Sequence, residues 1–156
     1  MKIYLASDHA GFELKEAIKP YLQEKGYEIE DKGALTLDKD DDYPDYGYPA
    51  AKAVAESGGD SRGILFCGAA EGICIVANKV KGIRAVAVWS EINARLSRED
   101  NDANVLCLSG GGKINPIPGL SLDEAKKIID IFLNTKFSEE ERHIRRIEKI
   151  KKLEAN

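Results

Sequence analysis

Short apolar runs alternate with helix-like segments along the whole chain, and this alternation constrains the fold more than any other sequence feature. Five β-type runs lie at residues 3–6, 27–30, 62–66, 84–88 and 104–108. Helical spacing of apolar residues marks the segments 11–25, 46–57, 72–80, 91–99, 123–134 and 138–153. Strands that alternate with helices build parallel sheets whose two faces are both covered. The sequence therefore predicts an α/β fold around a five-stranded parallel sheet, followed by a C-terminal helix.

Size and composition exclude several classes of protein. A chain of 156 residues is expected to form one domain, and a net charge of −4 argues against broad nucleic-acid binding. No apolar run approaches the roughly 20 residues of a membrane span, and the first residues resemble a strand rather than a signal peptide. Three cysteines, Cys67, Cys74 and Cys107, match neither a zinc pattern nor a disulfide framework. We therefore expect a cytoplasmic protein with reduced thiols and no nucleic-acid or membrane partner.

The ends of the predicted strands indicate where a ligand would bind. In parallel α/β sheets, ligands bind beyond the carboxyl ends of the strands. Four segments follow strands in this way: Asp8-His9, Cys67 to Gly72, Ser90, and Ser109 to Lys113. The run Gly110-Gly111-Gly112-Lys113 resembles a phosphate-binding loop only loosely, because it lacks the Walker spacing.

Cys67 is the strongest single candidate for chemistry. It ends an apolar strand and precedes a glycine-bearing loop and a helix, so backbone N–H groups are expected around it. Such a position favours a thiolate with a lowered pKa, suited to act as a base or nucleophile. The alternative is a small buried residue at a strand end. Cys74 and Cys107 lie in apolar segments and are expected in the core.

Polar residues near the other strand ends allow both a structural and a functional interpretation. Asp8 either caps the helix that follows or belongs to a site, and both histidines, His9 and His143, are expected outside the core. The Asp42-Tyr43-Pro44 segment suits a helix N-terminus, since proline is favoured there, but it could equally contact a ligand. The acidic run 38–42 is expected to be a solvated loop, and Asn101 either forms a turn or binds a ligand.

The segment 138–153 is predicted to be a basic helix whose acidic residues lead and basic residues follow, as the helix dipole favours. Its apolar residues form a thin stripe: Ile144, Ile147, Ile150 and Leu153. A thin stripe on a terminal helix suggests docking on a partner subunit. Arg142 and Arg146 lie one turn apart on one face, where two guanidinium groups can bind a phosphate.

Together these residues resemble the type B ribose-5-phosphate isomerase and galactose-6-phosphate isomerase family from about residue 2 to about residue 153. The motifs that carry the resemblance occur in this order: Asp8-His9-Ala10-Gly11, Asp42-Tyr43-Pro44, Cys67-Gly68 with Gly72, Ala77-Asn78-Lys79, Gly82-Ile83-Arg84, Leu96-Ser97-Arg98, Asn101-Asp102-Ala103-Asn104, and Arg142-His143 with Arg146. The resemblance implies a Rossmann-like α/β/α subunit that forms a homodimer or a dimer of dimers, without metal or cofactor. It also implies aldose–ketose isomerisation of a phosphorylated sugar through a cis-enediolate.

The resemblance implies a role for each matching residue. Cys67, Asp8 and Asp100 are the expected catalytic positions, with Cys67 moving the proton between C1 and C2 and Asp8 acting at the sugar hydroxyls and ring oxygen. The expected substrate-binding residues are His9, Tyr43, Gly68, Ala69, Ala70, Glu71, Gly72, Asn101, Lys113, Arg142, His143 and Arg146. Arg142 and Arg146 are expected to reach the phosphate from the partner subunit.

The chain departs from the family pattern at three places. The family loop usually reads Cys-Gly-Thr-Gly-x-Gly, whereas this chain has Ala69, Ala70 and Glu71. Asp100 replaces the histidine that opens the sugar ring in ribose-type members, and the turn 109–120 is longer than usual. The substrate therefore need not be ribose 5-phosphate. Two alternatives stay open: a sugar-phosphate binding or regulatory protein without turnover, and an enzyme in which Glu71 or Asp100 is the base.

Overall fold

The computed structural model describes residues 1–112 and 117–155 and contains one five-stranded parallel sheet. The sheet has the order β2-β1-β3-β5-β4. Its elements are β1 (Lys2–Ser7), α1 (Phe12–Glu24), β2 (Glu28–Asp31), α2 (Tyr43–Glu56), β3 (Ser61–Cys67), α3 (Glu71–Ala77), β4 (Ala85–Ala87), α4 (Glu91–Glu99), β5 (Val105–Ser109), α5 (Leu122–Asn134) and α6 (Glu141–Leu153). The predicted order of strands and helices is confirmed.

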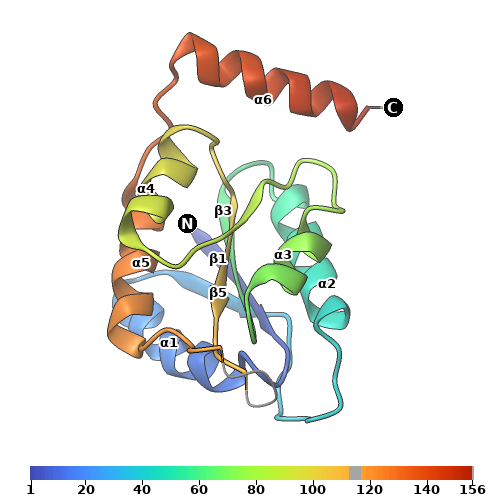
Figure 1. The fold of residues 1–156 in the computed structure, drawn as a ribbon, viewed down its shortest axis with the longest axis vertical. Helices are drawn as coiled ribbons and strands as arrows, with labels where there is room; N and C mark the ends of the chain where they lie inside the picture. The colour runs from blue at the N-terminus through green and yellow to red at the C-terminus, as the bar shows by residue number, and fades with distance from the viewer. Residues whose placement is uncertain (113–116, 156) are drawn as a thin grey trace.

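Two apolar layers cover the sheet, one on each face (Figure 1). On β3, Ile64 and Phe66 point towards the layer that contains residues of α1, α4 and α5. Leu65 and Cys67 point the other way, towards residues of α2 and α3. This alternation follows from the two-residue period of a strand, and it explains why the central strands are apolar almost throughout.

Three helix boundaries lie three residues from the predicted ones: α6 begins at Glu141 rather than at 138, and the other two differ for local reasons. Helix α2 begins at Tyr43 rather than at 46, with Pro44 in its first turn, where proline needs no hydrogen-bond donor. Helix α3 ends at Ala77 rather than at 80. There the Asn78 amide accepts from the Ala85 N–H at 2.8 Å and donates to the Ala85 carbonyl at 2.9 Å, which ties the chain to β4.

Helix α6 lies beyond the amino ends of the central strands, at the opposite end of the molecule from their carboxyl ends (Figure 1). The chain that leads into α6 is tied to the end of α4 by a bond from the Ser138 N–H to the Glu99 carbonyl, at 3.0 Å. In the part of the chain that the structure describes, no helix is both long and apolar enough to cross a membrane.

Candidate active site

The loop after β3 is held at the carboxyl edge of the sheet by the end of β5. The Gly110 N–H donates to the Cys67 carbonyl at 2.9 Å, and the Gly111 N–H donates to the Gly68 carbonyl at 3.1 Å. The Ser109 hydroxyl also donates to the Gly68 carbonyl, at 2.6 Å. These bonds hold the backbone of Cys67 and Gly68 against the end of β5.

The turn after β1 packs directly against this loop. A Cβ on Gly11 would overlap the backbone of Phe66, and a Cβ on Gly110 would overlap the carbonyl of Ala10. The approach of three chain segments therefore requires glycine at both positions. Asp8 shapes the turn, because its Oδ1 accepts from the N–H groups of Ala10 at 3.0 Å and Gly11 at 3.1 Å. Burial raises the pKa of the Asp8 carboxyl, although these two amides oppose the shift.

Cys67 lies at the centre of the edge and is only 4% exposed. The backbone N–H groups of Ile73, Ala70 and Ala69 lie close enough to its sulfur to favour the thiolate. Burial nevertheless has the larger effect, and with the nearby Asp8 charge it raises the pKa of the thiol above its ordinary value. The expectation of a lowered pKa is therefore wrong: the amide donors are present, but they do not offset the loss of hydration.

The loop that departs from the family pattern reaches its turn at Ala70. This residue is buried and has φ +68°, in the left-handed region that favours glycine. Helix α3 begins at the next residue, Glu71, whose side chain is exposed. The ring of Tyr43 covers Gly72, where an added Cβ would lie 2.9 Å from the ring Cζ. Tyr43 and the loop residues thus lie together, as the resemblance implies.

Asp41 is a site residue that the sequence did not indicate. Its Oδ1 accepts from the backbone N–H of His9 at 2.9 Å and lies 2.7 Å from the His9 ring Nδ1. Its side chain is only 4% exposed, so the expectation that the whole 38–42 run is solvated is wrong at this residue. The hydrogen bond to Asp41 raises the pKa of His9. No local pattern could have revealed the pair, because 32 residues separate its members.

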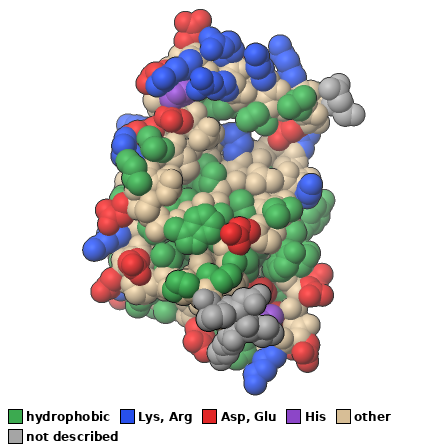
Figure 2. Space-filling view, viewed as in Figure 1, with side chains coloured by type: hydrophobic (Ala, Val, Ile, Leu, Met, Phe, Trp, Pro, Cys, Tyr) green, Lys and Arg blue, Asp and Glu red, His purple; other side chains and the backbone are tan. Residues whose placement is uncertain are grey.

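The other predicted site residues lie at the opposite edge of the sheet, which is formed by the amino ends of the central strands. Asp100 and Asn101 follow α4, and Arg142 and Arg146 are exposed on α6. Strand β5 separates this edge from Cys67: its four steps from Val105 to Ser109 span about 13 Å. Figure 2 shows the Lys and Arg side chains of α6 gathered at that end. One chain therefore does not bring the two groups of residues together.

His143 is buried at the start of α6, so the expectation that it lies outside the core is wrong. Its side chain is 2% exposed, with Nδ1 3.1 Å from the Ser138 hydroxyl and 3.5 Å from the Asp100 carboxylate. The contact links the end of α4 to the start of α6. Asp100 itself remains 42% exposed, at the position where ribose-type members of the family carry histidine.

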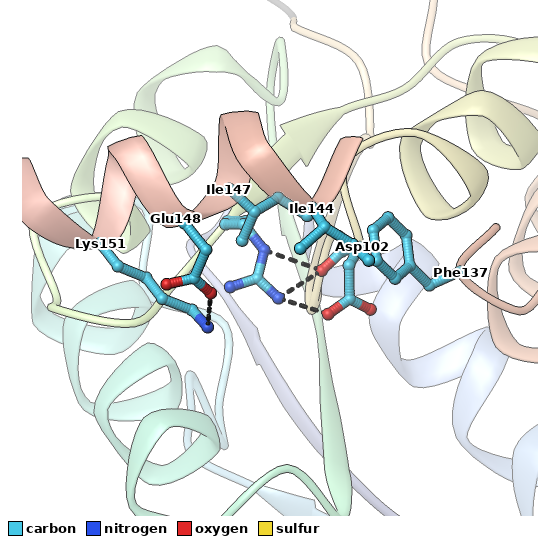
Figure 3. A pocket seen from close by; sticks show the side chains of 7 residues that line it. Asp102, Phe137, Ile144, Ile147, Glu148 and Lys151 are labelled. Atoms are coloured by element: carbon cyan, nitrogen blue, oxygen red, sulfur yellow. Dashed lines mark hydrogen bonds and ion pairs between the residues drawn. The ribbon is translucent and has the colours of Figure 1, made fainter. Parts of the chain in front are cut away.

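Helix α6 covers a cavity of about 120 Å³ that lies far from Cys67 (Figure 3). The cavity is lined by Arg84, Asp102, Phe137, Ile144, Ile147, Glu148 and Lys151. Within it, the Arg84 guanidinium donates to the Asp102 carbonyl and carboxylate, both at 2.7 Å. Only Ile147 of the apolar stripe is buried, while Leu153 is 75% exposed. The body of the same subunit therefore covers only part of the stripe.

Three further predictions concern Lys113, metal binding and the two cysteines other than Cys67. Lys113 lies outside the described residues. Among residues 1–112 and 117–155, no three His, Cys, Asp or Glu side chains are grouped so that they could hold a metal ion. Cys107 is buried, as expected for the core, whereas Cys74 is half-buried beside it.

The carboxyl edge of a parallel α/β sheet, where Cys67 lies, is the place at which proteins of this fold class bind small molecules. The Ribose/Galactose Isomerase family model matches residues 3–150. Ribose-5-phosphate isomerase B of Escherichia coli (strain K12) is 42% identical over 153 residues, which cover 98% of this chain and 96% of the relative. A probable ribose-5-phosphate isomerase B from Mycoplasma genitalium is 43% identical, over 95% of this chain and 92% of its own.

Solved structures agree with the sequence comparisons. The crystal structure of ribose-5-phosphate isomerase B from Mycoplasma genitalium with bound ribulose-5-phosphate matches with a TM-score of 0.91. It shares 41% sequence identity, and the match covers 99% of this chain and 97% of that one. The Clostridium thermocellum ribose-5-phosphate isomerase B matches with a TM-score of 0.88 at 42% identity, over 99% and 98% of the two chains. The chain therefore belongs to the ribose/galactose isomerase family and is an isomerase.

Proposed function

We propose that this protein interconverts an aldose phosphate and a ketose phosphate, with Cys67 as the base that moves a proton between C1 and C2. The observation that carries the proposal is the buried sulfur of Cys67 at the carboxyl edge, with the N–H groups of Ala69, Ala70 and Ile73 close enough to favour its thiolate. Ribose 5-phosphate and ribulose 5-phosphate are the first substrates to test, because the relatives named above are ribose-5-phosphate isomerases.

The reaction needs a base and a site for negative charge. The proton on C2 of an aldose is weakly acidic, so it leaves only if a positioned base accepts it while the carbonyl oxygen gains charge. The Cys67 thiolate takes the proton, the C2 electron pair forms the C1–C2 double bond, and the carbonyl π electrons move to O1. The thiol then returns the proton to C1, the proton on O2 passes to O1, and C2 becomes the carbonyl. Loop amides between Gly68 and Gly72 stabilise the enediolate oxygens.

Asp8 is suited to the proton transfers between oxygens. It is buried next to the Cys67 loop, and burial raises the pKa of its carboxyl, so that it gains and loses a proton more easily near neutral pH. Its Oδ1 is engaged by the two turn amides, which leaves Oδ2 for a sugar hydroxyl or ring oxygen. Asp8 therefore acts on oxygen while Cys67 acts on carbon.

The complete site is formed between two subunits of a homodimer. Asp100, Asn101, Arg142 and Arg146 lie too far from Cys67 within one chain, and they carry the charges and amide that a phosphorylated sugar requires. If α6 docks on a partner, its exposed apolar stripe becomes buried and its arginines reach the partner's carboxyl edge. Closed two-fold symmetry gives two such sites.

Mixing of inactive subunits tests the shared site. Cys67→Ala removes the base, and Arg146→Ala removes a phosphate ligand of the other half. If each site uses both subunits, an equal mixture that exchanges subunits recovers about a quarter of the wild-type activity, because half of the dimers hold one intact site of two. Mixtures that stay inactive after subunit exchange contradict the shared site.

Hydrogen isotope exchange at C2 tests the reaction itself. The panel should contain four- to six-carbon aldose and ketose phosphates, because Asp100 lacks the imidazole that could donate a proton to a ring oxygen. A four-carbon sugar phosphate that cannot close a ring by its C4 hydroxyl needs no such donor. Exchange with at least one member supports the isomerase. Binding without exchange across the whole panel instead supports a sugar-phosphate binding protein, consistent with Ala70 and Asp100 at altered positions.

A further inference from the structure

The turn after β1 carries a contact between His9 and Asp41, and Asp41 has no role in the isomerase chemistry described above. The Nδ1 of His9 lies 2.7 Å from Oδ1 of Asp41, and the same oxygen accepts the backbone N–H of His9 at 2.9 Å. Asp41 therefore contacts both the main chain and the ring of one residue. Two such contacts fix the direction of the ring as well as its place.

The contact also determines which ring nitrogen is free. An ionised carboxylate only accepts hydrogen bonds, so Nδ1 of His9 must be the donor to Asp41. This leaves Nε2 as the ring nitrogen that can meet a ligand, and the His9 side chain is 39% exposed. The Asp41 carboxylate is only 4% exposed and is shielded from solvent, so the bond is not competed away by water.

The His9 ring belongs to the carboxyl edge that holds the proposed base. Asp8, the residue before it, lies close enough to Cys67 for its charge to raise the pKa of the thiol. The charged groups that act on His9 among the described residues are Asp8 on its own turn and Asp41 on the acidic loop, and both favour the imidazolium. The second oxygen of Asp41 is buried without a hydrogen-bond partner in the part of the chain that the structure describes.

We propose that Asp41 is a positioning residue that holds His9 with its Nε2 directed at an anionic or hydroxyl oxygen of the substrate. The inference rests on the proposed function for the identity of the ligand, but the pairing stands on the geometry. Asp41 does not touch the reacting carbons; it acts through His9. Its effect is to keep a cationic donor at the edge of the site over a wider pH range than a free histidine allows.

The test compares Asp41→Asn with Asp40→Asn, a matched control in the same loop that removes the same charge from an exposed side chain. The chain has two histidines, so ¹⁵N-histidine labelling gives two ring spectra, and a His9→Gln variant assigns them. Asp41→Asn is expected to lower the pKa of His9, and Asp40→Asn to leave it close to that of the wild type. An unchanged pKa of His9 in Asp41→Asn overturns the proposal.

Kinetics separate positioning from a merely structural role. The assay is run at a pH between the His9 pKa of the variant and that of the wild type. There, Asp41→Asn should raise KM for the active sugar phosphate about tenfold, with a much smaller change in kcat. In a His9→Gln background, Asp41→Asn should add almost nothing, because its partner is gone. A full further loss in that background overturns the proposal. If the wild type acts on no sugar phosphate, the proposed function fails, while the His9 titration still decides the pairing.

Discussion

Replacement of Cys67 by alanine is the perturbation that tests the proposed chemistry most directly. The change removes the sulfur of a residue that is 4% exposed, beside three backbone N–H groups that favour its thiolate. A positioned general base contributes about 10²- to 10⁴-fold to a rate, so kcat should fall by that factor, which corresponds to roughly 3–5 kcal/mol. KM should change by less than about threefold, because the expected phosphate ligands remain in place.

The fold of this variant should survive. Loss of a sulfur-sized group from the core costs about 1 kcal/mol, a small part of the stability of a domain of this size. Cys107→Ala is the matched control, since Cys107 is buried in the same apolar cluster and has no proposed role. It should lose a similar amount of stability and keep kcat within about threefold.

Deuterium incorporation at C2 during turnover in D₂O, followed by NMR, measures the proton transfer directly. Thermal unfolding of both variants reports the fold. If Cys67→Ala still exchanges the proton at more than a tenth of the wild-type rate, Cys67 is not the base, and Glu71 or Asp100 becomes the candidate. If both cysteine variants lose activity equally, the loss is structural.

Three further predictions follow from other contacts. The value of kcat/KM should rise with pH through the Cys67 pKa, which burial places above that of an ordinary thiol, and a rate that levels off below the ordinary value contradicts this. Gly11→Ala should lower the free energy of unfolding in urea by about 3 kcal/mol and remove most of the activity, because its Cβ overlaps the β3 backbone. Gly26→Ala is the control: with φ +83° in open space, it should lower the free energy of unfolding by about 1 kcal/mol and leave activity intact. Lys15→Met should destabilise the fold by about 3 kcal/mol, because the fully buried Lys15 donates to Asp31 at 2.6 Å and Lys19, which also contacts Asp31, replaces it only in part. A variant as stable as the wild type in urea unfolding contradicts this.

Whether a feature of the fold or the site can be predicted depends on how far apart in the sequence the residues that form it lie. The order of strands and helices, and the place of Cys67 at a strand end, follow from patterns within a few residues, and the structure confirms both. Helix α2 begins three residues before its apolar periodicity, at the Asp42-Tyr43-Pro44 segment that proline marks as a possible helix N-terminus. Similarly, α3 is shorter than predicted because Asn78 binds β4, a contact beyond the reach of periodicity.

The pKa of Cys67 shows why a motif alone does not decide chemistry. Its amide neighbours could be expected from a loop before a helix, and they are present. The degree of burial could not, because it depends on how α2, α3 and the Asp8 turn close over the sulfur. Burial opposes the charged form more strongly than the amides favour it, so the direction of the shift is a property of packing.

The sequence by itself determined the parallel α/β architecture, the position of Cys67 at the end of a strand and the family, because apolar periodicity and short motifs depend on residues that are close together in the chain. Tertiary structure decided the rest. It buried His143 against Ser138, paired Asp41 with His9, and put Cys67 at the opposite end of the sheet from Arg146. These relations join residues that lie far apart in the chain, and only the path of the folded backbone fixes such distances.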